Sequence, residues 1–250
     1  NLKLRVSWGR LGNNSIGNYE WQAVYATAPH YAFGNKEVPG LGMGSFSNYN
    51  LEWETTTVTN LGIDFSMLKN RLSGTVEVYN KLTDGILYNP TLSPTLSGFS
   101  SPRQNIAEVT NKGLEITLGW NDRIGSVSYG ISGNFSYNKN EVTKLGLNKV
   151  YYYATTYTTE QPAIILKEGN SLGTFYGYVS KGVDPETGNI IYEDRNENGI
   201  IDPEDRTKIG DAQPLFVFGL TNTFSYANFN LSVFFQGSYG NDIFNASKID

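Results

Sequence analysis

Cysteine is absent from this 250-residue chain, which excludes a disulfide framework and a thiolate metal site. Charge is sparse: 19 basic and 24 acidic residues give a net charge of −5, and the basic residues are scattered, which argues against a nucleic-acid partner. No apolar run approaches the roughly 20 residues that a membrane-spanning helix requires. No signal-peptide pattern opens the chain, which begins with the strand-like LKLRVSWG, so we expect a piece of a longer protein.

Aromatic residues and glycine, by contrast, are abundant. Tyr, Phe and Trp make up 14% of the chain, and 27 glycines occur among many Asn, Ser and Thr residues. Aromatic side chains favour strands, whereas Gly, Asn and Ser favour turns. The composition therefore predicts an all-β protein.

Apolar and polar residues alternate with a period of two in seven segments, as in strands that have one apolar and one polar face. In the first example, Val127, Tyr129 and Ile131 share one face, and Ser128 and Ser132 lie on the other. The same alternation occurs within residues 2–8, 60–65, 72–78, 114–120, 216–226 and 230–239. Seven strands are therefore predicted.

The predicted connections are alternately short and long. Tight turns are expected at 68–72, 121–125 and 226–229, and long polar stretches at about 12–52, 89–109 and 146–214. This arrangement is typical of an antiparallel up-and-down transmembrane β-barrel, with tight turns at one end and extracellular loops at the other. We interpret residues 1–250 as part of one such barrel domain. The residues expected to face lipid include Leu114, Ile116, Leu118, Val127, Tyr129 and Ile131, and those expected to face the lumen include Glu115, Thr117 and Ser128.

A soluble β-sandwich shows the same alternation. Aromatic residues cluster at the strand ends, among them Trp8, Trp53 and Trp120, as in the interfacial girdles of membrane barrels. The polar faces are rich in Ser, Thr and Asn rather than in Lys and Glu. Both features favour the barrel. A soluble extracellular carbohydrate-binding β-sandwich with a structural calcium stays open as the alternative.

Residues 194–205, DRNENGIIDPED, lie in the long 146–214 loop region and have the spacing of a calcium-binding loop. Gly199 stands at the sixth position, where a sharp turn is needed, and three closely spaced carboxylates would repel one another without a cation. The twelfth position is Asp and no helices flank the loop, so it is not an EF-hand. The predicted ligands of a structural calcium are Asp194, Asn196, Asn198, the Ile200 carbonyl, Asp202 and Asp205. A polar turn without metal is the alternative.

Two loop regions, 18–33 and 151–157, are rich in aromatic residues. Planar rings stack on sugar faces and act as anchors at protein interfaces, but they also pack on one another within loops. The candidates for substrate or partner contact are Tyr19, Trp21, Tyr31, Tyr151, Tyr152, Tyr153 and Tyr157.

An enzyme is not indicated. His30 is the one histidine, and no nucleophile elbow accompanies it. Asp64, Glu77 and Glu115 lie on polar strand faces that a barrel lumen already explains. The glycine-rich GLGMGS at 40–45 lacks the lysine and the helix of a phosphate loop.

Seven segments, in order along nearly the whole chain, resemble the SusC/RagA-type TonB-dependent outer-membrane transporters of Bacteroidetes. They are LKLRVSWGRLGNNSIGNY (2–19), NLEWETTTVTNLGIDF (50–65), NKLTDGILY (80–88), NKGLEITL (111–118), GTFYGYVSKGV (173–183), DRNENGIIDPEDRTKIGDAQP (194–214) and NLSVFFQGSYGNDIFN (230–245). The resemblance implies the C-terminal part of a barrel of about 22 strands, closed by a plug.

The resemblance also implies a function and partners. We expect the protein to import nutrient oligomers across the bacterial outer membrane, with its barrel in contact with membrane lipid. Glycans are the first candidate for the cargo and peptides the second. The implied partners are a SusD-like surface lipoprotein that acts as a lid, and TonB, which would engage an N-terminal part not found in this sequence.

Overall fold

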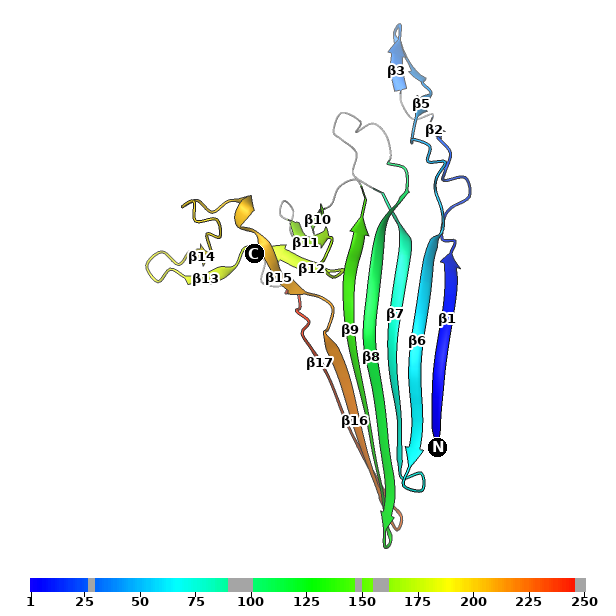
Figure 1. Ribbon diagram of the computed structural model, residues 1–250. Coiled ribbons are helices and arrows are strands. Elements are labelled where there is room, and N and C mark those ends of the chain that lie inside the picture. The colour runs from blue at the N-terminus through cyan, green and yellow to red at the C-terminus, as the bar shows by residue number, and fades with distance from the viewer. Residues whose placement is uncertain (27–29, 90–100, 147–149, 155–161, 246–250) are drawn as a thin grey trace.

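The computed structural model describes residues 1–26, 30–89, 101–146, 150–154 and 162–245. Its main element is an antiparallel seven-stranded sheet, here called the large sheet (Figure 1). The strands, in spatial order, are β1 (Leu2–Asn13), β6 (Glu54–Met67), β7 (Leu72–Tyr88), β8 (Gln104–Ile124), β9 (Val127–Leu145), β16 (Phe216–Tyr226) and β17 (Phe229–Tyr239). Each strand pairs with the next one along the chain apart from two insertions, so the predicted seven-stranded up-and-down meander is confirmed.

Short turns join the strands at one end of the large sheet, the turn end, and long connections leave from the other, the loop end (Figure 1). The β6–β7 turn holds Leu68, Lys69 and Asn70 in succession at φ 54°, 58° and 68°. The β16–β17 turn has Ala227 at φ 49°. The turns predicted at 68–72 and 226–229 are confirmed, whereas the one predicted at 121–125 falls at 125–126, because β8 continues to Ile124. β8 begins at Gln104, so the prediction of a loop up to residue 109 was wrong. The upper part of β8 pairs with β7 as far as Tyr88, and this pairing extends the strand.

The strand register separates the side chains into an apolar face and a polar face. One row across six strands consists of Leu4, Ile63, Val76, Ile116, Phe135 and Phe218. The adjacent row across all seven strands consists of Lys3, Asp64, Thr75, Thr117, Asn134, Gly219 and Gln236. A one-residue slip would exchange these sets, so the alternation specifies the register.

Much of the apolar face is open in the chain as described. Leu4 is 66% exposed, Val6 77%, Leu231 58% and Phe235 57%. In a soluble β-sandwich such a face packs against a second sheet. Its exposure therefore disagrees with the sandwich alternative and agrees with a face that meets lipid. No helix among the described residues is long and apolar enough to cross a membrane.

The long connections contain short strands that the sequence pattern did not reveal. Within 146–214, predicted as a loop region, the described residues form a four-stranded sheet, here called the small sheet, and an arm. The small sheet consists of β10 (Val150–Ala154), β11 (Pro162–Lys167), β12 (Thr174–Gly177) and β15 (Thr207–Asp211); the arm, residues 178–206, holds the hairpin β13 (Ser180–Val183) and β14 (Ile190–Tyr192) and the short helix η2 (Pro203–Asp205). In the first connection, β2 (Tyr25–Ala26) pairs with β5 (Gly42–Met43), and β3 (His30–Phe33) pairs with β4 (Lys36–Pro39).

A cluster of buried apolar residues lies where the small sheet meets the large one. It consists of Ile106, Ala107, Val109, Val142, Leu145 and Tyr151. Backbone hydrogen bonds attach the same junction to β9, because Val142 N donates to Asn170 O at 2.8 Å and Gly169 N donates to Val142 O at 2.9 Å. The loop end is thus a packed structure rather than a set of loose loops.

Candidate functional site

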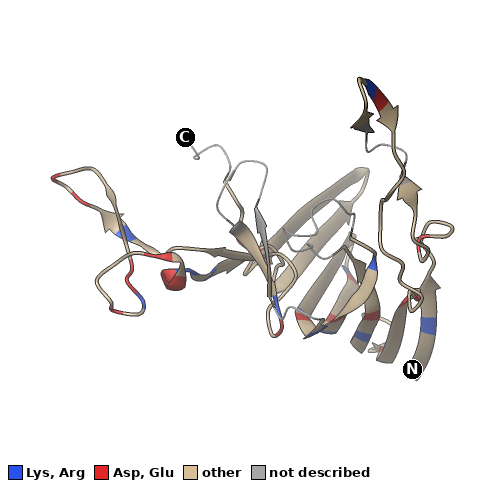
Figure 2. Cartoon of the chain, turned by 90° about the horizontal axis from the view of Figure 1, so that it is seen from above, with Lys and Arg blue, Asp and Glu red and all other residues tan. Residues whose placement is uncertain are grey.

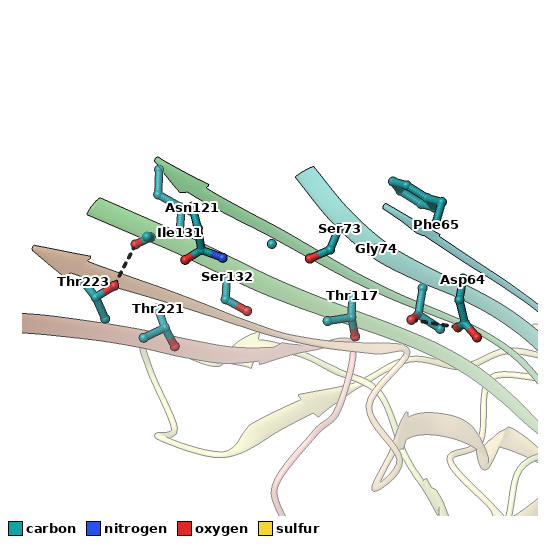
Figure 3. A pocket seen from close by; sticks show the side chains of 13 residues that line it. Asp64, Phe65, Ser73, Gly74, Thr117, Asn121, Ile131, Ser132, Thr221 and Thr223 are labelled. Carbon is teal, nitrogen blue, oxygen red and sulfur yellow. Dashed lines mark hydrogen bonds between the residues drawn. The ribbon is translucent and has the colours of Figure 1, made fainter. Parts of the chain in front are cut away.

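The polar face of the large sheet carries a shallow hollow of about 400 Å³ (Figure 3). Hydroxyl and amide groups dominate it, while Phe65 and Ile131 point to the opposite side of the sheet (Figure 3). The polar side chains are Asp64, Ser73, Thr75, Thr117, Asn121, Ser132, Thr221 and Thr223. Such groups bind water and neutral polar solutes, because each donates and accepts hydrogen bonds without carrying a charge.

Arg5 pairs with two of the acidic side chains on this face, Asp64 and Glu77. Arg5 donates two hydrogen bonds to Asp64, from Nε to Oδ2 at 2.8 Å and from Nη2 to Oδ1 at 3.0 Å. Its Nη1 lies 3.2 Å from Glu77 Oε2. Gly62 makes room for this fork, since a Cβ there would stand 3.0 Å from Arg5 Nη2. Glu115 lies directly opposite Glu77 in the register. A bidentate pair of this kind fixes the geometry of both strands.

An amide cluster continues the polar face toward the loop end. Tyr79 Oη donates to Asn138 Oδ1 at 3.1 Å, and Asn111 Oδ1 accepts from the Nδ2 of Asn138 and of Asn140 at 3.3 and 2.8 Å. Asn140 Oδ1 in turn accepts from Leu172 N at 2.7 Å. The cluster therefore ties the β11–β12 connection of the small sheet to β7, β8 and β9.

The calcium-loop pattern folds as a series of side-chain-supported turns. Asp194 accepts from Asn198 N at 3.2 Å and from Gly199 N at 2.7 Å, and Gly199 has φ 81°. Asn196 Oδ1 accepts from Asn198 N at 3.1 Å, and Asn198 Oδ1 accepts from Ile200 N at 2.8 Å. Glycine at the sixth position thus adopts the left-handed conformation that the motif was expected to require.

Asp205 anchors the end of this loop. Its side chain is fully buried, its Oδ1 accepts from Arg195 N at 2.7 Å, and its Oδ2 accepts from Asp202 N at 2.9 Å. Asp202 accepts from Glu204 N at 2.7 Å, which completes a capping box around η2. The hydrogen bond from Asp202 N holds the pKa of the Asp205 carboxyl below its ordinary value, and this outweighs the opposing effect of burial.

Calcium remains a prediction. A carboxylate that accepts one backbone N–H per oxygen retains lone pairs for a cation. Across the described residues, however, no group of three or more His, Asp or Glu side chains is close enough to hold a metal ion. The other predicted ligands, two Asn side chains and the Ile200 carbonyl, are not groups of these types. The prediction therefore depends on the spacing of the six residues, and chelation is its test.

The predicted aromatic contact residues fall into separate groups. Tyr19 is 70% exposed, and the Trp21 ring lies 5.5 Å from the Tyr49 ring. Tyr151 is buried, with its ring 5.1 Å from that of Tyr88, so the structure supports packing rather than contact there. The backbones of Tyr31, Tyr152 and Tyr153 lie in β3 and β10, and Tyr157 lies outside the described residues.

His30 belongs to the exposed β3–β4 hairpin, with its Nδ1 2.7 Å from Glu37 Oε1. Both side chains are more than half exposed. This pair lies on the outermost part of the first connection, far from the polar face (Figure 1).

Comparison with known proteins decides the family. The profile described as "TonB dependent receptor-like, beta-barrel" matches residues 1–247. The chain belongs to the TonB-dependent receptor β-barrel family. It is 34% identical to TonB-dependent receptor P3 of Formosa agariphila over 99% of this chain and 26% of the relative, and 31% identical to TonB-dependent receptor SusC of Bacteroides thetaiotaomicron over 97% and 25%.

Solved structures agree with the family. The chain superposes on a structure titled as the RagAB peptide transporter with a TM-score of 0.78 and 26% identity, over 96% of this chain and 26% of that one. The resemblance to SusC/RagA-type transporters and the expected all-β barrel portion are thereby confirmed. This chain spans about a quarter of the length of the relatives it matches.

Sequence reasoning missed two parts of the site in this TonB-dependent receptor barrel. The amide cluster was one, although the closely spaced Asn138 and Asn140 in SYNKNE were its visible signal. The other was the small sheet, whose strands are 4–6 residues long. Segments of this length contain too few residues for a clear alternation.

Proposed function

We propose that this chain is part of the wall of a TonB-dependent transporter that imports nutrient oligomers across a bacterial outer membrane. The observation that carries the proposal is the family match over residues 1–247 to a sheet with one exposed apolar and one polar face. The apolar face suits lipid, and the polar face suits a lumen. The loop end then lies outside the cell, and the turn end faces the periplasm.

A SusD-like lipoprotein is the proposed partner at the loop end. Support comes from the arm, which projects away from the large sheet in both views (Figures 1 and 2). The arm exposes apolar side chains, with Val183 at 60%, Ile190 at 53% and Ile200 at 66%. Exposed apolar groups on a projecting segment are typical of contact surfaces. TonB would act on the remaining part of the transporter.

Glycans are the proposed cargo. The polar hollow is dominated by hydroxyl and amide groups, and its one carboxylate, Asp64, is paired with Arg5, which suits an uncharged hydrophilic solute. Peptide is the second candidate, because the similar RagAB structure is titled a peptide transporter.

The test uses the full-length transporter in its native host. We expect the protein to partition with outer membranes, to require detergent for extraction and to co-purify with a surface lipoprotein. Deletion of its gene should abolish uptake of a neutral oligosaccharide, while uptake of peptides of similar mass continues. Free solubility of the full-length protein would contradict the transporter, and loss of peptide uptake alone would replace glycan by peptide.

A further inference from the structure

Phe234 departs from the pattern of the polar face. It lies on β17 between Ser232 and Gln236, with Thr221 as its partner on β16, and its side chain is 58% exposed. Among the described residues it stacks on no other aromatic ring. Within the described residues, this ring lies on the polar side amid hydroxyls and amides, away from the apolar face and outside the buried apolar cluster.

A second hollow, of about 450 Å³, adjoins this ring toward the loop end of β16 and β17. Gly219 forms part of its floor. A Cβ at Gly219 would stand 3.4 Å from Phe234 Cε2 and press directly on Asn134 Oδ1. The absence of a side chain at this position therefore keeps the hollow beside the ring open.

The groups around the ring are neutral and have free hydrogen-bonding capacity. The side-chain amides of Asn134 and Gln236 both line the hollow, and neither bonds to another described residue. Ser238 also lines it, and its Oγ donates to Asn241 Oδ1 at 3.1 Å, which leaves the lone pairs of Oγ available. No Lys, Arg, Asp or Glu side chain is among the described residues lining this hollow.

We propose that this hollow is a binding site for a neutral saccharide ring, with Phe234 as its stacking platform; the proposal rests on the import function above. A sugar ring has a face of C–H groups that packs on an aromatic surface, and a rim of hydroxyls that both donate and accept hydrogen bonds. Two free carboxamides beside an exposed ring match those features. The charged ends of a short peptide would find no opposite charge here, and leaving a charge unpaired is unfavourable.

Substitutions at Phe234 test the platform. The full-length transporter in detergent is titrated calorimetrically with a panel of neutral gluco-, fructo- and manno-oligosaccharides and with uncharged peptides of similar mass. For an oligosaccharide that the wild type binds, Phe234→Ala and Phe234→Leu should each weaken the affinity at least tenfold, and Phe234→Tyr should retain it. Leucine preserves apolar bulk but not a flat ring, so it separates stacking from simple packing.

Two further variants sharpen the test. Gly219→Ala, whose Cβ would narrow the hollow and press on Asn134 Oδ1, should weaken oligosaccharide binding as Phe234→Ala does. Ser232→Ala, on the same face of β17 but outside the hollow, is the matched control and should leave the affinity unchanged.

Several results would overturn the site. Unchanged oligosaccharide affinity in Phe234→Ala, with uptake intact, removes the site but leaves the import function standing. A lowered melting temperature in Phe234→Leu with unchanged affinity assigns the ring to packing against another part of the transporter. Binding of the peptides alone rejects the saccharide, and a wild type that neither binds nor imports any member of the panel rejects the proposed function itself.

Discussion

In the large sheet, the environment of each side chain depends on which of the two faces it lies on. Ile131 shares the apolar face with Trp120, its partner in the register, whereas the next residue, Ser132, lines the polar hollow. Adjacent positions of one strand therefore meet opposite environments, which makes them a matched pair for experiment.

Arginine at these two positions should have unequal effects. Ile131→Arg places a charge in lipid and should lower the free energy of unfolding by about 2–4 kcal/mol if the residue lies near the bilayer midplane. Ser132→Arg reaches the water of the lumen and should change it little. Urea unfolding of the full-length protein in lipid vesicles measures both, and equal penalties would refute the orientation.

Acid should loosen the 194–205 loop through Asp205. Because the pKa of this carboxyl is lowered from 3.8 in the folded loop, the ionised form stabilises the loop above that pH. That stabilisation is lost as the pH falls through the lower, folded value. Amide hydrogen exchange of residues 195–205, corrected for intrinsic rates, should accelerate in that window. Asp205→Asn should show fast exchange at neutral pH, and a pH-independent wild type would contradict the assignment.

At the scale of secondary-structure elements, the β16–β17 turn holds one residue in a strained backbone conformation, and this strain can be tested. Ala227 has φ 49°, a conformation that glycine adopts more readily than alanine. Ala227→Gly should therefore raise the free energy of unfolding by about 0.5–1 kcal/mol, and Ala227→Val should lower it. The denaturation midpoint reports both changes, and a destabilising glycine would show that the turn is not strained.

Calcium removal tests the arm as an element. If an ion binds the six predicted ligands, chelation by EGTA should raise protease sensitivity within 194–205 while β16 and β17 remain intact. Asp194→Ala should abolish the effect of the chelator. Calcium-independent cleavage would reduce the motif to a turn maintained by its own hydrogen bonds.

The sequence predicted the seven long strands and missed most of what lies above them, for a physical reason. Residues such as Leu114, Ile116 and Leu118 face a uniform environment, so alternation alone locates and orients them. Tyr151 and Val142 are buried by contacts between distant segments, and no local pattern encodes such contacts. Likewise, the spacing of 194–205 predicted the sharp turn at Gly199 but not the burial of Asp205.

At the scale of the whole molecule, the small sheet is attached to the large sheet at two places. The β9 attachment runs through Asn140 and residues 168–172. The other lies beyond β17, where Asp242 N donates to Asp211 O at 2.6 Å and Asp211 N donates to Asp242 Oδ2 at 2.9 Å. Between these attachments, the buried Thr174 Oγ1 lies 2.9 Å from Asp211 Oδ1 and 2.8 Å from Ser171 O. Burial raises the pKa of the Asp211 carboxyl, but its hydrogen bonds to Lys208, Ser171 and Thr174 lower it by more, so the pKa is below its ordinary value.

Thr174→Val should weaken this junction by about 1–3 kcal/mol, because it removes a buried hydroxyl whose single proton serves Asp211 Oδ1 or Ser171 O. Native-state hydrogen exchange should show the loss in β12 and β15 and no change in β6 and β7. Thr221→Val, in the open hollow of the polar face, is the control and should have little effect. Exchange that rises uniformly over the chain would mean that the junction is not a separate unit.

The two-sided attachment has a mechanical consequence. A pull on the arm is transmitted through the small sheet to β9 and, at the same time, to the segment that follows β17. Because both attachments hold the small sheet, they share the applied force. The hydrogen bonds of one attachment should therefore not break one after another while the other remains intact, and the junction should resist rupture. The arm itself joins the small sheet at residues 178 and 206, here called its neck, where the Tyr178 and Tyr192 rings lie 5.3 Å apart and Arg206 lies 5.0 Å from the Tyr178 ring. Under tension the arm should swing about that neck before the wall deforms.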